Sequence, residues 1–183
     1  MKFQFQVNIA ENDYIEFNKF HQLRSPYGIK NILTFRILVA VICFGFVIAN
    51  LSYGSFDFEA WLTTIPIFVI FIVFNVFIRK MLGFSIKQNI KHLKKHGKMA
   101  YAPSAILEFG ENSLVETTEN TKAEIKYSTI ERISVIGDKY IYIHFNNVSA
   151  VIMPETCFEN KAQREKLLEF LRTLNTKYDL YNG

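Results

Sequence analysis

Cysteine, proline and glycine are scarce in this chain of 183 residues, which contains two, four and eight of them. The two cysteines, Cys43 and Cys157, lie in segments of very different composition, so we expect no disulfide between them. The sequence also lacks a phosphate-binding glycine loop, a paired His and Glu metal motif and a nucleophile elbow. These absences predict a protein that is not an enzyme and that uses no cofactor.

Metal-binding patterns are equally sparse. His92 and His96 are four residues apart on a predicted helix, a spacing that two metal ligands can use. Because no third ligand is evident and lysines surround the pair, we interpret both as solvated residues of a basic helix face and expect no metal site.

Acidic residues are missing from residues 79–98, which contain seven lysines and arginines. Residues 99–183 contain nine basic and twelve acidic residues, so the positive charge of the chain is concentrated in one short segment. A mildly acidic domain is repelled by phosphate backbones, and we therefore expect no nucleic-acid binding.

Two apolar runs, residues 32–53 and 61–78, are separated only by the seven residues of Gly54–Ala60. The second run has no charged residue, and the first has only Arg36, near its start, from where a long side chain can reach the headgroups. Both are long enough to cross a bilayer, and neither has the polar face of a soluble core helix. The first begins too far into the chain for a signal peptide. We predict a transmembrane hairpin over residues 32–78.

Basic residues on both sides of the hairpin orient it. The loop 54–60 has Asp57 and Glu59 but no lysine or arginine, whereas both flanks are basic. The positive-inside rule then places both termini in the cytoplasm. Residues 1–31 are predicted to form a cytoplasmic strand, from the alternation in Lys2–Ile9, and a helix that ends near Pro26.

The segment 79–98 is predicted to be a basic juxtamembrane helix, because Ile86, Ile90 and Leu93 recur at helical spacing. Two interpretations stay open. The helix lies against a bilayer with anionic headgroups, or it is a stop-transfer flank whose apolar stripe packs on the cytoplasmic domain. In the first interpretation the contact residues are Lys87, Lys91, Lys94, Lys95 and Lys98.

Residues 99–183 have the pattern of an antiparallel sheet closed by a helix. In the helix, Asn160 to Gln163 resembles a capping box, and Leu167, Leu171, Leu174 and Tyr178 form an apolar stripe. The predicted fold class is an α+β membrane protein, a two-helix hairpin with a cytoplasmic antiparallel sheet. The six expected strands are Ala105–Phe109, Ser113–Thr118, Lys122–Tyr127, Glu131–Ile136, Tyr140–Phe145 and Ser149–Met153.

Six strands followed by a helix resemble a pleckstrin-homology-like domain, and several details are similar to the bacterial YcxB-like family. The segments that carry the resemblance are 101–104 with Phe109, 125–130, 138–143, and 152–154 with Phe158. The resemblance implies a scaffold in the bacterial inner membrane and no known activity. A pleckstrin-homology-like sheet has seven strands, so Lys2–Ile9 is a candidate for the seventh. The turn Gly110–Asn112 lacks the basic residues of inositol-phosphate binders.

We therefore expect a bacterial inner-membrane protein that presents its cytoplasmic domain as a protein-binding or regulatory module, with an unidentified protein or a second copy of itself as partner. The alternative is an envelope-stress or antimicrobial-peptide immunity factor that acts mainly through its hairpin. Asn50 and Asn75, the polar amides of the spans, are candidates for hydrogen bonds across the hairpin.

Overall fold

The computed structural model describes residues 3–53, 58–97, 101–146 and 149–182. They form two compact units. One unit combines the N-terminal residues to Phe17 with the residues from Leu93 onward, and the other is the segment Asn18–His92. We call them the sheet unit and the hairpin unit. Lys98 of the predicted basic segment and residues 54–57 of the predicted loop lie outside the described residues.

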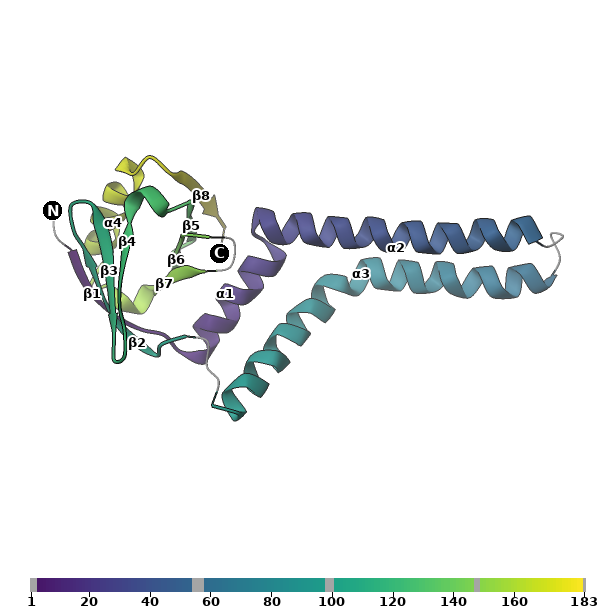
Figure 1. The fold of residues 1–183 in the computed structure, drawn as a ribbon, viewed down its shortest axis with the longest axis horizontal. Coiled ribbons are helices and arrows are strands. Elements are labelled where there is room, and N and C mark those ends of the chain that lie inside the picture. Colours follow the sequence, from purple (N-terminus) through teal and green to yellow (C-terminus); the bar gives the residue numbers. More distant parts are fainter. Residues whose placement is uncertain (1–2, 54–57, 98–100, 147–148, 183) are drawn as a thin grey trace. The chain divides into compact units, whose positions relative to one another are not determined.

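The sheet unit contains two four-stranded sheets (Figure 1). The first is an antiparallel meander with the order β1-β2-β3-β4. Its strands are β1 (Phe3–Asn8), β2 (Ser104–Phe109), β3 (Ser113–Thr118) and β4 (Lys122–Lys126). The strands expected here are confirmed with small shifts at their ends.

The N-terminal strand joins the sheet that follows the hairpin. β1 pairs antiparallel with β2, from Phe3 opposite Phe109 to Asn8 opposite Ser104. Its inward side chains, Phe5 and Val7, are only 2% and 1% exposed. The candidate strand predicted from the alternation in the first nine residues is thereby confirmed, and the hairpin unit is an insertion into the sheet unit.

The second sheet has the order β7-β6-β5-β8. β5, β6 and β7 are antiparallel neighbours, whereas β8 pairs with β5 in the parallel direction. The strand bounds are β5 (Arg132–Ile136), β6 (Tyr140–His144), β7 (Ala150–Pro154) and β8 (Lys177–Tyr181). Two 3-10 turns, η1 (Tyr127–Thr129) and η2 (Glu155–Cys157), precede β5 and follow β7.

The strand β8 corrects the sequence interpretation of the C-terminus. We expected the helical stripe to continue to Tyr178, but α4 (Lys161–Thr173) ends at Leu174, whose backbone is extended with φ −70° and ψ 132°. Tyr178 fits both interpretations, because it is four positions after Leu174, as in a helix, and two positions before Leu180, as in a strand. The described residues after the hairpin therefore contain seven strands, and one of them is parallel to its neighbour.

A single hydrophobic core lies between the two sheets and α4. It contains residues of both sheets together with Leu167, Leu168 and Leu171 of α4, which are at most 3% exposed. The helix begins at a side-chain cap, since Asn160 accepts a hydrogen bond from the backbone N–H of Gln163. This confirms the predicted capping signal.

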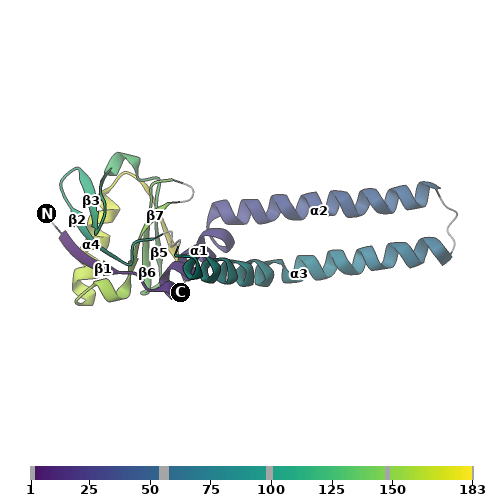
Figure 2. The same cartoon turned by 60° about the horizontal axis from the view of Figure 1, so that its bottom comes forward.

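Three helices connect β1 to β2: α1 (Glu11–Leu23), α2 (Pro26–Tyr53) and α3 (Phe58–Lys95). In Figures 1 and 2, α2 lies alongside the first part of α3, and the later part of α3 turns away from α2. α3 runs without a break through the junction expected near residue 78, so the second apolar run and the basic segment are one helix.

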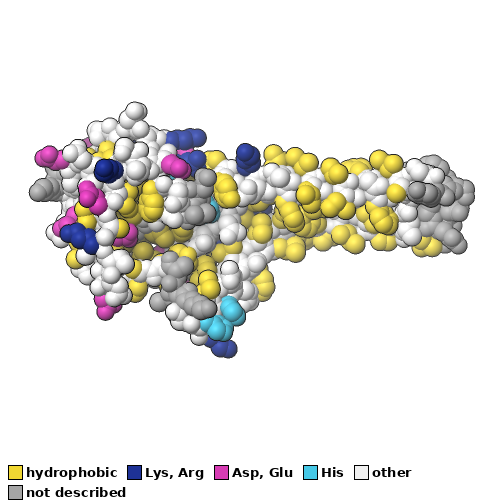
Figure 3. All heavy atoms as spheres, in the orientation of Figure 1, with side chains coloured by type: hydrophobic (Ala, Val, Ile, Leu, Met, Phe, Trp, Pro, Cys, Tyr) yellow, Lys and Arg dark blue, Asp and Glu magenta, His cyan; other side chains and the backbone are white. Residues whose placement is uncertain are grey.

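Both long helices expose apolar side chains. The stretches Pro26–Asn50 and Leu62–Lys95 are long and apolar enough to cross a membrane, and only 6% and 11% of their most apolar windows are buried. Figure 3 shows hydrophobic side chains along this surface of α2 and α3. Hydrogen bonds join the helices from Asn50 Nδ2 to Thr63 Oγ1 at 3.1 Å and from Arg36 Nη2 to the carbonyl of Asn75 at 2.9 Å. The cross-hairpin role expected of Asn50 is confirmed, but the Asn75 amide instead donates to Phe71 of its own helix.

Candidate functional site

The basic face of α3, defined as Lys87, Lys91, Lys94 and Lys95, is exposed along the described helix. The apolar residues between these lysines have the opposite environment, since Ile86 and Ile90 are each 6% exposed. The helix closes at Gly97, which has a positive φ of 66° and donates its N–H to Lys94. The contact of the basic face with anionic headgroups stays a prediction.

One lysine of the basic face has an acidic partner in the sheet unit. Lys94 Nζ lies 2.5 Å from Glu11 Oε2, in the first turn of α1. The hydrogen bond to Glu11 and the charge of its carboxylate raise the pKa of Lys94. The positive charge of Lys94 is therefore partly compensated, a contact that sequence reasoning missed because the two residues are 83 positions apart.

His92 and His96 both lie exposed near the end of α3. Among the described residues, no group of three or more potential metal ligands is present. The structure therefore adds no third ligand to this pair within the part of the chain that it describes.

The outer face of the second sheet is covered by the first half of α1. Tyr140 donates a hydrogen bond to Asp13 Oδ1 at 3.0 Å, and Phe17 makes an edge contact with Tyr142 at a centroid distance of 5.2 Å. Burial, with a smaller effect from the hydrogen bond to Asp13, raises the pKa of Tyr140 to about 12. His144 of β6 lies under the same helix and is only 5% exposed. The helix that leads into the hairpin is thus held on the sheet by specific polar and aromatic contacts.

A hollow in the sheet unit has a volume of about 500 Å³ and lies on the outer face of the first sheet. Neighbouring strands supply its floor, where Gln6, Ile106 and Thr117 lie in register across β1, β2 and β3. Ile106 is 40% exposed there, and Leu180 of β8 is the other strongly exposed large apolar side chain among the described residues of this unit. The remaining wall comes from residues 101–105 and from Thr118, Glu119 and Asn120.

The rim of the hollow is well ordered by local bonds. Thr121 donates its N–H to Thr118 Oγ1 at 3.0 Å, and the Thr118 N–H donates to the Thr121 carbonyl at 2.8 Å. On the other side, Tyr101 stacks on Tyr14 of α1 with a centroid distance of 4.5 Å. Glu119 is the charged residue among those that line the hollow, and the other lining residues are polar or apolar but uncharged.

This hollow was missed in the sequence interpretation, because its floor exists only when β1 lies beside β2. The signal that could have found it is the apolar Ile106 on a face of β2 that otherwise carries Ser104 and Glu108. With β1 assigned to the edge next to β2, the register would have placed Gln6 and Thr117 beside it.

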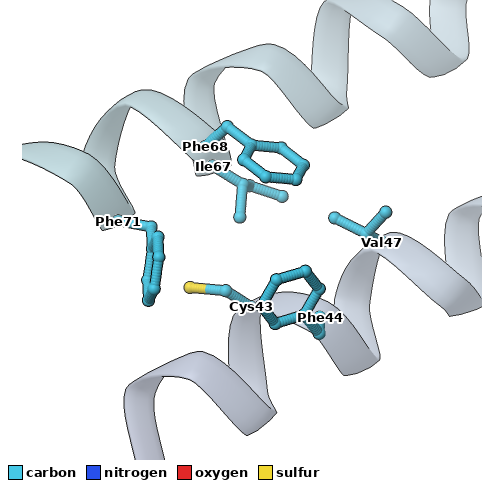
Figure 4. Close-up of a pocket in the computed structure, with 6 residues that line it drawn as sticks. All are labelled: Cys43, Phe44, Val47, Ile67, Phe68 and Phe71. Carbon is cyan, nitrogen blue, oxygen red and sulfur yellow. The ribbon is translucent and has the colours of Figure 1, made fainter. Parts of the chain in front are cut away.

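A second, apolar pocket lies between α2 and α3 in the hairpin unit. Figure 4 shows Cys43, Phe44 and Val47 of α2 facing Ile67, Phe68 and Phe71 of α3. Its cavity volume is about 10 Å³, which is about the space of one water molecule. The pocket is therefore a packing gap of the hairpin, too small for a ligand.

Comparison with curated proteins and with solved structures gave no match. A family model does match the sheet unit, over strands β3 to β7 and most of α4. Residues 109–171 match the family described as YcxB-like protein, which confirms over this segment the resemblance seen in the sequence.

Proposed function

We propose that this protein is anchored in the bacterial cytoplasmic membrane by α2 and α3 and that its sheet unit works on the cytoplasmic side as a protein-binding module. The observation that carries the anchoring is the exposure of the two long helices. Soluble core helices bury most of their apolar surface, whereas only 6% and 11% of these two windows are buried. A lipid bilayer would cover the apolar surface of α2 and α3 that the rest of the protein leaves exposed.

The pairing of β1 with β2 supports a hairpin topology independently of charge. The chain leaves the sheet unit after β1, passes through α2 and α3, and returns to pair with the strand that it left. Both ends of the hairpin must therefore be on one side of the membrane. The lysines and arginines of both flanks favour the cytoplasmic side.

The hollow beside Ile106 supports the binding role. A protein partner needs an exposed apolar contact surrounded by polar groups, and this hollow offers one on a rigid sheet. The scarcity of charge in its lining favours a protein segment over a phosphate-bearing ligand.

Topology is tested by labelling single cysteines in whole cells. In a chain with Cys43→Ser and Cys157→Ser, we expect Ser55→Cys to react with a membrane-impermeant maleimide in intact spheroplasts. Glu111→Cys, in the turn between β2 and β3, should react only after lysis. Labelling of Glu111→Cys in intact spheroplasts would contradict the cytoplasmic placement.

The binding role is tested with two matched substitutions. Ile106→Arg fills the hollow with a charge, whereas Leu180→Arg makes the same kind of change at an apolar side chain of β8 that is 69% exposed. Full-length protein from native membranes should co-purify a protein partner in the wild type and in Leu180→Arg, but not in Ile106→Arg. Identical lists from all three would favour a function that lies in the hairpin, as in the envelope-protection alternative.

A further inference from the structure

Arg36 is the charged residue of the apolar run 32–53 and lies four positions after its first residue. It is 14 positions before Asn50, the residue that bonds to Thr63 near the far end of the hairpin. At about 1.5 Å per residue, Arg36 lies about 21 Å along the helix from Asn50. In a hydrocarbon core of about 30 Å, its side chain starts inside the inner leaflet, within reach of the headgroups.

The guanidinium is held in place but is not neutralised. Its Nη2 donates to the Asn75 carbonyl of α3, and its Nε is buried without a hydrogen-bond partner among the described residues. Residues 26–53 and 60–95 contain no Asp or Glu, so neither α2 nor the part of α3 from residue 60 onward supplies a counter-charge. An arginine side chain stays charged in proteins and has five N–H donors, whereas the structure pairs Arg36 with a single neutral acceptor, the Asn75 carbonyl.

Additional cations lie at the same end of the hairpin. Lys30 precedes Arg36 on α2, Arg79 follows Asn75 by one helical turn on α3, and both are exposed. Charge in a low-dielectric surrounding requires an anionic partner, and the anion nearest to this depth in a bilayer is a lipid phosphate.

We infer that Arg36, fixed by the Asn75 carbonyl, binds the phosphate of an anionic phospholipid of the inner leaflet. The planar guanidinium suits a phosphate because two of its N–H groups can donate in parallel to two oxygens. This inference rests on the proposed membrane anchoring and deepens it, since it assigns a lipid to a site distinct from the basic face of α3.

The test compares full-length variants in neutral detergent. We expect added phosphatidylglycerol to raise the thermal unfolding midpoint of the wild type more than phosphatidylcholine does. Arg36→Gln should lose most of that difference, and Arg36→Lys should keep only part of it. Arg172→Gln removes an exposed arginine from α4 in the sheet unit and should keep the full difference.

Three results would overturn the lipid site. The first is an equal lipid response of Arg36→Gln and the wild type, and the second is a wild type with no preference for the anionic lipid. The third is an Arg36→Gln variant that keeps the lipid response of the wild type but loses a co-purifying protein. That result would assign Arg36 to a carboxylate of the protein partner. If Arg36→Gln cannot be recovered folded, the partial response of Arg36→Lys and the lipid preference of the wild type decide. Carbonate extraction of membranes separates the membrane anchoring from the phosphate site. Release of the wild type by carbonate overturns both proposals. Retention of the wild type, together with equal lipid responses of the wild type and Arg36→Gln, overturns only the phosphate site.

Discussion

The hydroxyl of Ser25 accepts a hydrogen bond from the backbone N–H of Gly28 at 3.0 Å and donates one to the carbonyl of His21. Ser25 is thereby the N-cap of α2 and also binds the last turn of α1, and it is only 2% exposed. Pro26 follows at the first helical position, where its missing N–H costs nothing. A single side chain thus fixes the corner at which the chain enters the hairpin.

Gly28 at this corner has no room for a side chain. A Cβ added there would overlap the backbone carbonyl oxygens of His21 and Gln22, and backbone atoms cannot move aside as a side chain can. We expect Gly28→Ala to lower the free energy of unfolding by about 1–3 kcal/mol, the usual cost of overpacking. Thermal unfolding of the purified protein in detergent measures this change.

The matched control for this change is Gly45→Ala, farther along the same helix. A Cβ added at Gly45 meets nothing within 4 Å. Replacing a helical glycine by alanine is otherwise favourable by about 1 kcal/mol, so Gly45→Ala should leave the midpoint unchanged or raise it. Equal loss of stability in both variants would contradict the tight corner.

Phe5 tests whether β1 belongs to the folded sheet unit. Its ring packs on Phe109 and Phe158 at centroid distances of 5.9 and 5.3 Å, and the side chain is 2% exposed. Removal of a buried phenylalanine typically costs 3–5 kcal/mol, so we expect Phe5→Ala to destabilise the protein by about that amount. Urea unfolding followed by circular dichroism measures the loss.

Gln4→Ala on the same strand is the control, because Gln4 is exposed and pairs with Glu108 through backbone positions. It should change stability by less than about 0.5 kcal/mol. A tolerated Phe5→Ala would mean that β1 is not part of the core.

The sequence predicted most of the strands because each alternates apolar and polar residues between short turn signals. Ser113–Thr118, for example, is observed with the predicted ends. The apolar length of α2 and α3 was equally clear, because residues 61–78 have no charge at all. Such patterns can be read within one short segment, without knowledge of which segments lie next to each other in the fold.

Long-range relationships were harder to predict. The burial of His144 depends on α1 lying over β6, and the parallel pairing of β8 depends on the chain turning back after α4. The hydrogen bond of Arg36 to Asn75 spans 39 positions, and the sequence interpretation, which placed this side chain within reach of the headgroups, did not predict that partner. Such contacts follow from tertiary packing, which no local period records.

Asn160 offers a test of the helix that closes the core. Its side chain accepts from the Gln163 N–H at 2.9 Å, and the Gln163 side chain accepts from the Glu159 N–H at 2.8 Å. Replacing such an N-cap by alanine leaves an amide of the first turn unpaired and costs about 1 kcal/mol. Asn160→Ala should therefore lower the unfolding free energy by that amount, and Asn160→Gly by clearly less. An equal effect of the two substitutions would show that the cap contributes little to the stability of α4.

Cys157 provides a test by pH. Burial raises the pKa of its thiol from 9.0 to about 12, although its own backbone and Arg164 act in the opposite direction. At pH 8 the folded protein should have about a thousandfold less thiolate at this position than an ordinary cysteine, and only the thiolate reacts. In a Cys43→Ser chain, we expect slow alkylation by iodoacetamide at pH 8 and fast alkylation once guanidinium unfolds the protein.

The same shift predicts the direction of the stability change with pH. Because the folded state holds this proton more tightly than the unfolded state, the contribution to stability is complete below about pH 9 and is lost as the pH rises toward 12. The alkylation rate of Cys157 in the folded chain should keep rising about tenfold per pH unit above pH 9. The control is an exposed thiol, introduced by Glu159→Cys in a Cys43→Ser, Cys157→Ser chain. Its alkylation rate should level off near pH 9. If the Cys157 rate levels off together with the control, the partial burial of Cys157 against the core does not raise the pKa of its thiol. A continued rise would show that η2 remains packed against the core while its cysteine ionises.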